Sequence, residues 1–332
     1  MRSVHEQQPG PKWQHLFDKH WPQYKGWFLS QGQQARPGYV TSSKKLHTNM
    51  PELASTYEQL VELAGGGDLA ARFLSFYRPP PYLLGCSQAV WDGQRPMLIR
   101  NYDYSPELFE WTLLYSCWRR PVIAITDCLW GVLDGMNDAG LAVSLAFGGN
   151  KATGDGFGIP LVLRYILETC DTMLEACETL RRIPVHMAYN VTILDSNHAY
   201  TTAYLTPGRK PRFSRLRVST NHQDRIEWKA YERMSASIER RAFLEEHLTD
   251  ANETSRTFLN RFLQPPIYRT RYDRAFGTLY TAVYRPQELA VEYHWPHRPA
   301  LHQSFADFRE SRELITLTQP KAPATRTRSM AG

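Results

Sequence analysis

"PPPYLLGCSQAVWDGQRPMLIRNYDYSPE" (Pro79–Glu107) is where the chain changes from a helical to an extended pattern. The proline-rich run ends the helical pattern, because proline fixes φ and disfavours a helix in the residue before it. "CSQAVW" and "PMLIRNYDY" then predict two short strands joined by the turn "DGQR", which is a hairpin signal. The first strand begins with Cys86, directly after Gly85. The sequence therefore poses one question: is Cys86 a core residue or a nucleophile?

The flanking patterns indicate an α+β protein. Residues 1–78 are predicted to be helical, and "IPLVLRYILETCDTMLEACETLRRI" predicts a helical hairpin that begins near Pro160. "RPVIAITDCLWGVLDGMNDAGLAVSLAFGG", "YNVTILDSNHAYTTAYLT" and "GTLYTAVYRPQELAVEYHWP" are of β type, and "SASIERRAFLEEHL" is helical. Hairpins with segregated helices indicate antiparallel sheets and not a βαβ series.

Composition places the chain among soluble globular proteins, with 42% hydrophobic and 22% charged residues out of 332. No apolar run reaches 18 residues and the N-terminus lacks the apolar core of a signal peptide, so we expect no membrane span and a cytoplasmic protein. The cysteines show no CxxC spacing, which argues against a disulfide framework or a zinc ribbon. No His, Asp or Glu cluster has metal-ligand spacing, so no metal is expected. The cysteines are Cys86, Cys117, Cys128, Cys170 and Cys177.

The net charge of +6 raises the possibility of a nucleic-acid partner. Lys and Arg are dispersed among Asp and Glu, so we expect no such partner. Residues 319–332, "QPKAPATRTRSMAG", are predicted to form a disordered basic tail, with a nucleic-acid arm as the alternative. Neither GxGxxG nor GxxxxGK[ST] is present, so a nucleotide-binding loop has little support.

Cys86 would gain a base of its own if the Gly85–Cys86 bond were cut. A thiolate is the reactive form of cysteine and needs a base or a lowered pKa. The new α-amine of Cys86, with a reference pKa near 8, could be that base. In an uncut chain, Cys86 is only a cysteine on a strand, and a buried core residue is the ordinary interpretation.

The "RNYDY" segment favours catalysis. Alternation along a strand places Arg100 and Tyr102 on one face and Asn101 and Asp103 on the other. A twist or a bulge could still bring Arg100 and Asp103 into one site. Asp103 would then orient the α-amine and Arg100 would hold a thiolate or a substrate carboxylate. The alternative is a plain ion pair on a strand, which contributes little.

Several sequence blocks occur in a characteristic order from Cys86 to about Trp295: "GCS", "RNYDY", "DGMNDAGLAV", "IPLVLRYILETCDTMLEACETL", "YNVTILD", "STNHQ" and "TLYTAVYRPQELAVEY". In this order they resemble the cysteine-type N-terminal nucleophile (Ntn) hydrolases. The autoproteolytic acyl-CoA:6-aminopenicillanic acid acyltransferases are the most similar, and choloylglycine hydrolases and acid-ceramidase-like amidases are more distant. The resemblance implies a four-layer αββα sandwich of antiparallel sheets with an α-helical N-terminal pro-segment. Residues 1–85 would be that pro-segment, kept as a small subunit after cleavage, and residues 86–318 the catalytic domain.

The resemblance also implies roles for individual residues. Cys86 matches the nucleophile, released by self-cleavage after Gly85, and Arg100 and Asp103 match the charged residues that flank it. Asn221, in "TNH", matches an asparagine that stabilises the oxyanion, whereas the residue alone would favour a turn-forming asparagine at a strand end. A late active-site arginine is also usual in these enzymes. Arg240, in "SIERR", is our candidate, with Arg241 and Arg274 as alternatives, and each of them could instead be an arginine on a helix surface.

The chain departs from the family at the second oxyanion donor. Choloylglycine hydrolases carry another asparagine just after the "GMNxxGL" block, where Phe147 stands here and cannot donate. A backbone N–H or Asn190 could replace it, although Asn190 could equally be a strand-edge residue. His222 could line the substrate pocket or be a solvated loop histidine. Tyr102 and its aromatic neighbours would suit an apolar acyl group, or could simply be core residues.

These residues imply an enzyme that cleaves or forms amide bonds through a thioester acyl-enzyme. It would be a linear-amide hydrolase or an acyl-CoA-dependent N-acyltransferase, with no cofactor and with acyl-CoA as a candidate co-substrate. Its expected partners are a small-molecule amide or acyl-thioester and its own N-terminal fragment, with a homo-oligomer as a candidate assembly. The alternatives are an unprocessed, non-catalytic homologue that binds small molecules and a basic RNA-associated protein.

Overall fold

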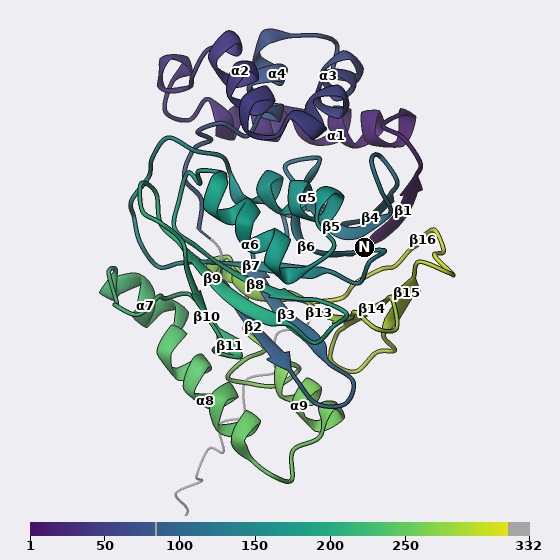
Figure 1. Cartoon of the computed structure of the whole chain (residues 1–332), viewed down its shortest axis with the longest axis vertical. Coiled ribbons are helices and arrows are strands. Elements are labelled where there is room, and N and C mark those ends of the chain that lie inside the picture. Colours follow the sequence, from purple (N-terminus) through teal and green to yellow (C-terminus); the bar gives the residue numbers. More distant parts are fainter. Residues whose placement is uncertain (84, 318–332) are drawn as a thin grey trace, which may run out of the picture.

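The protein is a sandwich of two packed sheets with helices on both outer sides, as the computed structural model shows (Figure 1). The structure describes residues 1–83 and 85–317. The predicted basic tail, residues 319–332, lies outside the described residues. The predicted αββα arrangement of antiparallel sheets is confirmed.

The larger sheet runs in the order β10-β9-β8-β7-β6-β5-β4-β1-β16. Its neighbouring strands are antiparallel except for the parallel pair of β1 and β4. The strands are β1 (Arg2–Glu6), β4 (Thr112–Ser116), β5 (Val122–Asp127), β6 (Gly131–Asn137), β7 (Ala142–Phe147), β8 (Tyr189–Leu194), β9 (Tyr200–Leu205), β10 (Arg212–Ser214) and β16 (Ser311–Arg312).

The smaller sheet carries the cysteine hairpin. Its order is β11-β2-β3-β13-β14-β15, with β12 added beside β13, and all of these pairs are antiparallel. The predicted hairpin is β2 and β3, joined through the "DGQR" turn. The strands are β2 (Gly85–Trp91), β3 (Met97–Tyr104), β11 (Val218–Ser219), β12 (Thr270–Arg271), β13 (Phe276–Arg285), β14 (Ala290–His294) and β15 (Leu301–Ser304).

Helices cover the outer face of each sheet (Figure 1). The larger sheet is covered by α5 (Ile159–Thr169) and α6 (Met173–Arg182), which form the predicted helical hairpin. The smaller sheet is covered by α8 (Ser237–Thr249) and α9 (Ser255–Phe262), and α7 (Lys229–Ser235) precedes them. Short 3-10 turns complete the elements at Gln33–Ala35, Pro51–Leu53 and Tyr272–Arg274.

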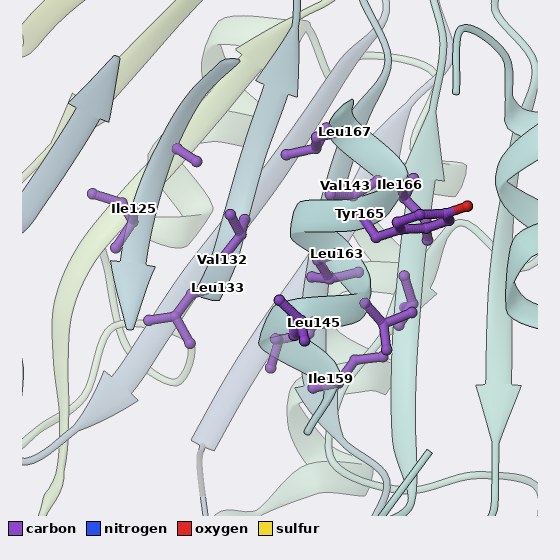
Figure 2. Close-up of a cluster of buried hydrophobic side chains, with 14 of the residues drawn as sticks. Ile125, Val132, Leu133, Val143, Leu145, Ile159, Leu163, Tyr165, Ile166 and Leu167 are labelled. Atoms are coloured by element: carbon purple, nitrogen blue, oxygen red, sulfur yellow. The ribbon is translucent and has the colours of Figure 1, made fainter. Parts of the chain in front are cut away.

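Helix α5 forms the centre of one apolar cluster. Figure 2 shows Leu163, Ile166 and Leu167 of α5 beside Val143 and Leu145 of β7. All residues from Ile159 to Glu168 are buried, so α5 is covered on every side. Because a helix buried all round needs a second covering layer, its far side must be closed by other helices.

The N-terminal segment supplies that second layer with α1 (Pro11–Phe28), α2 (Tyr39–Asn49), α3 (Ala54–Leu63) and α4 (Asp68–Leu74) (Figure 1). The Tyr165 hydroxyl of α5 donates to Glu52 at 2.7 Å, which ties the layers together. The segment also contributes strand β1, although residues 1–78 are predicted to be helical. "RSVHE" is short and only partly buried, and its partner strand lies more than 100 residues away, so its sequence gives little β signal. The predicted domain boundary after Gly85 stays a prediction.

No helix in the described residues is long and apolar enough to cross a bilayer.

Candidate active site

The register of the β2–β3 hairpin sorts the candidate residues onto two faces. Cys86 lies opposite Tyr102, and Gln88 lies opposite Arg100. Residues directly opposed in antiparallel strands point to the same face, and side chains alternate along each strand. Cys86 and Arg100 therefore share the face toward the larger sheet. Asp103, opposite Gly85, lies on the face toward α8 and α9.

Arg100 is held beside the sulfur of Cys86. Its Nη2 lies 3.2 Å from Sγ of Cys86, and both residues are fully buried. Its Nε donates to the Leu145 carbonyl at 3.1 Å, and its Nη1 donates to the Tyr280 hydroxyl at 2.9 Å and to the Asp134 carboxylate. The ion pair with Asp134 joins the two sheets and fixes the direction of the guanidinium.

The Cys86 thiol needs a base to become reactive. Burial raises its pKa, because water no longer solvates the thiolate, and the negative charge of Asp103 adds to this. Arg100 and Arg240 lower the pKa but do not offset burial. The thiol is therefore protonated in this state, and Arg100 alone does not activate it.

The backbone of Cys86 is held by Asn221 and Arg240. The N–H of Cys86 donates to Oδ1 of Asn221 at 2.9 Å. Arg240 donates to the Cys86 carbonyl at 2.7 Å and to Oδ1 of Asn221 at 2.7 Å. Nδ2 of Asn221 donates to the Phe147 carbonyl at 3.2 Å. The nitrogen that would become the α-amine thus already faces a side-chain oxygen. The role of Asn221 as oxyanion donor stays a prediction.

Asp103 lies beside Arg240 and not beside Arg100. Its Oδ2 is 3.8 Å from Nη1 of Arg240, and its Oδ1 accepts from the Thr278 hydroxyl at 2.7 Å. An ion pair between Arg100 and Asp103 on the strand is therefore wrong, because alternation separates their side chains. Oδ2 of Asp103 has no hydrogen-bond partner within the described part of the chain.

Arg240 is the late arginine that the fold brings into this cluster. It is fully buried, and it also donates to Oγ of Ser87 at 2.6 Å. Arg241 is instead partly exposed and pairs with Glu245 at 2.8 Å along α8. Arg274 is exposed and lies 3.8 Å from Asp273. Of the three candidates, only Arg240 contacts Cys86 and Asn221 among the described residues.

Asn190 and His222 support the loop that carries Asn221. Nδ2 of Asn190 donates to the Thr220 and His222 carbonyls, both at 2.9 Å. Nδ1 of His222 lies 2.7 Å from Oγ of Ser237, and the ring is half-buried. Burial, with help from Arg241 and Arg240, lowers the pKa of His222 to about 4, so its ring is neutral near pH 7. Both side chains thus hold the loop, and their roles toward a substrate stay predictions.

Tyr102 forms an aromatic wall next to Arg100. Its ring centre is 4.7 Å from Cζ of Arg100, a cation–π arrangement. The ring also packs against Tyr104, Phe109 and Tyr280, with centroids 5.5–5.7 Å apart. Tyr102 is completely buried, so its contact with a substrate would need space beside it.

Sequence reasoning missed Asp134 and Tyr280, which fix Arg100. Asp134 stands within "GVLDGMN", a strand buried along its whole length. A charged residue in such a strand indicates a buried partner of opposite charge, since buried charges are normally paired. Its partner Arg100 is 34 positions away and on the other sheet, so the sequence does not reveal the pairing.

No three His, Cys, Asp or Glu side chains in residues 1–83 and 85–317 gather in a way that could hold a metal ion.

The fold and the site together define a class of protein. Two antiparallel sheets between helical layers, with a buried cysteine at the start of a strand, are the arrangement of the cysteine-type Ntn hydrolases. Residues 91–299 match the family model of acyl-coenzyme A:6-aminopenicillanic acid acyl-transferase, which is more than half of the chain. The chain belongs to this family. Arg100, Asp103, Asn221 and Arg240 fall inside the match, and Cys86 lies five residues before it.

Several solved structures are similar to the chain. Penicillin V acylase from Agrobacterium tumefaciens is 15% identical, with 67% of this chain and 86% of that chain covered and a TM-score of 0.47. A mutant of conjugated bile acid hydrolase from Clostridium perfringens is 12% identical, with 72% and 99% covered and a TM-score of 0.46. A Caenorhabditis elegans N-acylethanolamine-hydrolyzing acid amidase ortholog is 16% identical, with 61% and 93% covered and a TM-score of 0.43. With TM-scores below 0.5, none of these likenesses identifies the substrate of this chain. No curated protein matches its sequence.

Membership of the family supports an amide-hydrolase or acyltransferase activity for this chain.

Proposed function

We propose that the protein is an autoproteolytic cysteine Ntn enzyme that cleaves or forms amide bonds through a thioester acyl-enzyme. One observation carries the proposal. The thiol and the backbone nitrogen of Cys86 each meet their own polar partner, Arg100 at 3.2 Å and Asn221 at 2.9 Å, in a fully buried cluster. An Ntn enzyme uses both of these atoms, the sulfur as nucleophile and the nitrogen as base, whereas a core cysteine needs neither contact.

Self-cleavage would come first. Sγ of Cys86 attacks the carbonyl carbon of Gly85, and the C–N bond breaks as the acyl group moves from nitrogen to sulfur. Water then hydrolyses the Gly85 thioester. The products are the Gly85 carboxylate, the thiol and the free α-amine of Cys86. Arg100 stabilises the sulfur as it becomes negative, and Arg240 holds the Cys86 carbonyl so that the bond stays in place.

Substrate turnover would use the same atoms. The α-amine accepts the thiol proton, and Sγ attacks the carbonyl of an amide or acyl-thioester. Asn221 and backbone N–H groups bind the oxyanion, and Asp103 orients the amine. The leaving group takes the proton, and the thioester acyl-enzyme is resolved by water in a hydrolase or by an amine in an N-acyltransferase. In the latter case, acyl-CoA is the proposed acyl donor.

The cleaved N-terminal fragment would remain as a small subunit. Strand β1 lies between β4 and β16 in the larger sheet, and Trp13, Leu16 and Phe17 of α1 are buried. Removing the fragment would expose these surfaces to water, which opposes dissociation.

Intact mass of the purified protein beside its Cys86→Ala variant tests the proposal. Fragments of residues 1–85 and 86–332 are expected in the wild type only. The matched control is Cys117→Ala, a cysteine on the larger-sheet side that should leave cleavage unchanged. A single uncut chain in both wild type and Cys86→Ala would remove the proposed base and favour an unprocessed binding protein instead.

A further inference from the structure

A cavity of about 90 Å³ lies between helix α1 and the end of the sandwich. Its lining includes two exposed residues, Gln23 and Leu108, and two buried ones, Asp127 and Cys128, which are 8% and 7% exposed. This volume accommodates a head group of a few non-hydrogen atoms. The site described above does not use this cavity.

Four aromatic rings form the walls: Tyr24, Trp27, Tyr82 and Tyr104. The rings of Trp27 and Tyr82 meet edge to face at 6.0 Å, and those of Tyr24 and Trp27 meet at 6.5 Å. Aromatic faces are electron-rich, and several of them around one space attract a cation, above all a quaternary or primary ammonium group.

Asp127 supplies a carboxylate with few hydrogen-bond partners, namely the Cys128 backbone N–H and a long contact with the Tyr24 hydroxyl. The Tyr24 hydroxyl lies 3.3 Å from Oδ1 of Asp127 but is closer to Oε1 of Glu110. A phenol has one proton to donate, so the shorter contact with Glu110 takes it. Glu110 also accepts from the Leu129 N–H at 2.7 Å and from the Thr126 hydroxyl at 3.0 Å. Glu110 is therefore satisfied, whereas Asp127 lines the cavity with acceptor capacity to spare.

Among the described residues, this carboxylate forms no ion pair, and Arg100 acts on it only at longer range. No lysine, arginine or histidine forms an ion pair with Asp127 or Glu110 in residues 1–83 and 85–317. An unpaired carboxylate that is nine-tenths buried is costly, and the cost falls when the group is protonated or gains a positive partner. An ammonium group in the cavity would be such a partner.

The cavity lies on the same face of β3 as the cysteine site. Arg100, Tyr102 and Tyr104 alternate along β3 and so share the face on which Cys86 lies. Tyr104 lines the cavity, and its ring lies 5.7 Å from that of Tyr102, which is opposite Cys86. Two residues of strand correspond to roughly 7 Å, so the cavity begins about that far from the nucleophile.

We propose that this cavity binds an ammonium group carried by the substrate. The preferred substrates would then be amides, or acyl acceptors, that bear a second and positively charged nitrogen roughly 7 Å or more from the reacting carbonyl. The assignment to substrate rests on the proposed function, because the reaction is placed at Cys86. Binding of the cation itself requires only Asp127 and the aromatic walls.

The test is calorimetric titration of the Cys86→Ala protein with choline at pH 8, next to its neutral isostere 3,3-dimethylbutan-1-ol. Choline should bind at least about 10-fold more tightly than the isostere, since only choline gains the charge-assisted and cation–π contacts. Asp127→Asn should weaken choline binding about 10-fold or more. Asp18→Asn, which removes an exposed carboxylate on the same helix α1 as Tyr24 and Trp27, should leave it unchanged.

Equal binding of choline and the isostere to the folded protein, or no binding of either, would overturn the proposal. If Asp127→Asn does not fold, Trp27→Leu provides a second variant, because it removes a wall and keeps the carboxylate. The Cys86→Ala protein cannot turn over substrate, so a failure here is separate from a failure of self-cleavage. If choline binds to the Cys86→Ala protein but the wild type does not cleave itself, the cation site is supported and the proposed reaction is rejected.

Discussion

Asp134 fixes the orientation of the Arg100 guanidinium beside Cys86. Among the described residues, it forms no hydrogen bond with the cysteine sulfur itself. Its carboxylate accepts from Arg100, Tyr280 and Tyr284, all fully buried. Removing one partner of a buried ion pair leaves the other charge uncompensated. Asp134→Asn should therefore lower the free energy of unfolding by about 3–5 kcal/mol. Urea unfolding monitored by tryptophan fluorescence measures this change.

A matched surface substitution distinguishes this effect from a general loss of charge. Asp138 pairs with Arg120 at the protein surface, where an ion pair contributes about 1 kcal/mol or less. Asp138→Asn should accordingly change stability little. If the Asp134 and Asp138 variants unfold at the same urea concentration, the buried Arg100–Asp134 pair does not contribute more to the free energy of unfolding than a surface pair.

At the same scale, local sequence was enough to place the hairpin residues but not their partners. Alternation in "RNYDY" correctly separates Arg100 from Asp103, because the side-chain period of a strand is fixed by the backbone. Asp134 and Asn221 reach the site from other strands and loops, through contacts with sequence separations of 34 and 135 residues. Such contacts depend on how the two sheets pack, which no local pattern encodes.

At the scale of the element, strand β1 determines how firmly the N-terminal segment is attached. The Arg2 N–H donates to the Trp111 carbonyl at 2.8 Å, and alternation directs the Val4 N–H to the same side, toward β4. Val4→Pro would remove that donor from the ladder. It should lower the urea midpoint and make residues 1–85 easier to release by limited proteolysis.

Val40→Pro is the control for the general effect of proline on backbone freedom, as distinct from the loss of a hydrogen bond between β1 and β4. Val40 is 76% exposed and stands in the first turn of α2, where proline is tolerated. It should therefore leave both measurements nearly unchanged. Equal effects of the two proline variants would contradict a role for the β1 pairing.

Elements with strong local signals were predicted well. The α5–α6 hairpin has an N-terminal proline, an apolar run and a Thr172–Glu175 capping box, all of which can be identified in the sequence. β1 has none of these signals. Its five residues become a strand because β4 and β16 flank it in the folded molecule, and tertiary context outweighs local preference there.

At the scale of the whole molecule, pH should reveal the buried carboxyl pair under α1. Burial, together with the neighbouring charge of Glu110, raises the pKa of Asp127 to about 7, and burial also raises the pKa of Glu110. An Asp with a raised pKa keeps its proton in the folded state at a pH where the unfolded chain has lost it. Its contribution to stability is therefore present at low pH and is lost as pH rises from about 4 to about 7.

Two histidines act in the opposite direction over a similar range. Burial lowers the pKa of His20 and of His222 to about 4. The unfolded chain then holds more protons than the folded one between about pH 4 and pH 6.5, so their contribution to stability rises with pH in that window. The pH profile of the wild type alone mixes the two effects, and only a difference between variants separates them.

Asp127→Asn isolates the carboxyl contribution, because it keeps the shape of the side chain and cannot ionise. Relative to the wild type, it should become progressively more stable from pH 4 to pH 8, by a total on the order of a few kcal/mol. Urea unfolding at unit steps of pH measures this difference. For Asp18→Asn, exposed on α1, the difference should stay flat. A flat difference for Asp127→Asn as well would mean that Asp127 ionises normally. Burial beneath α1 would then impose no free-energy cost on its charged form.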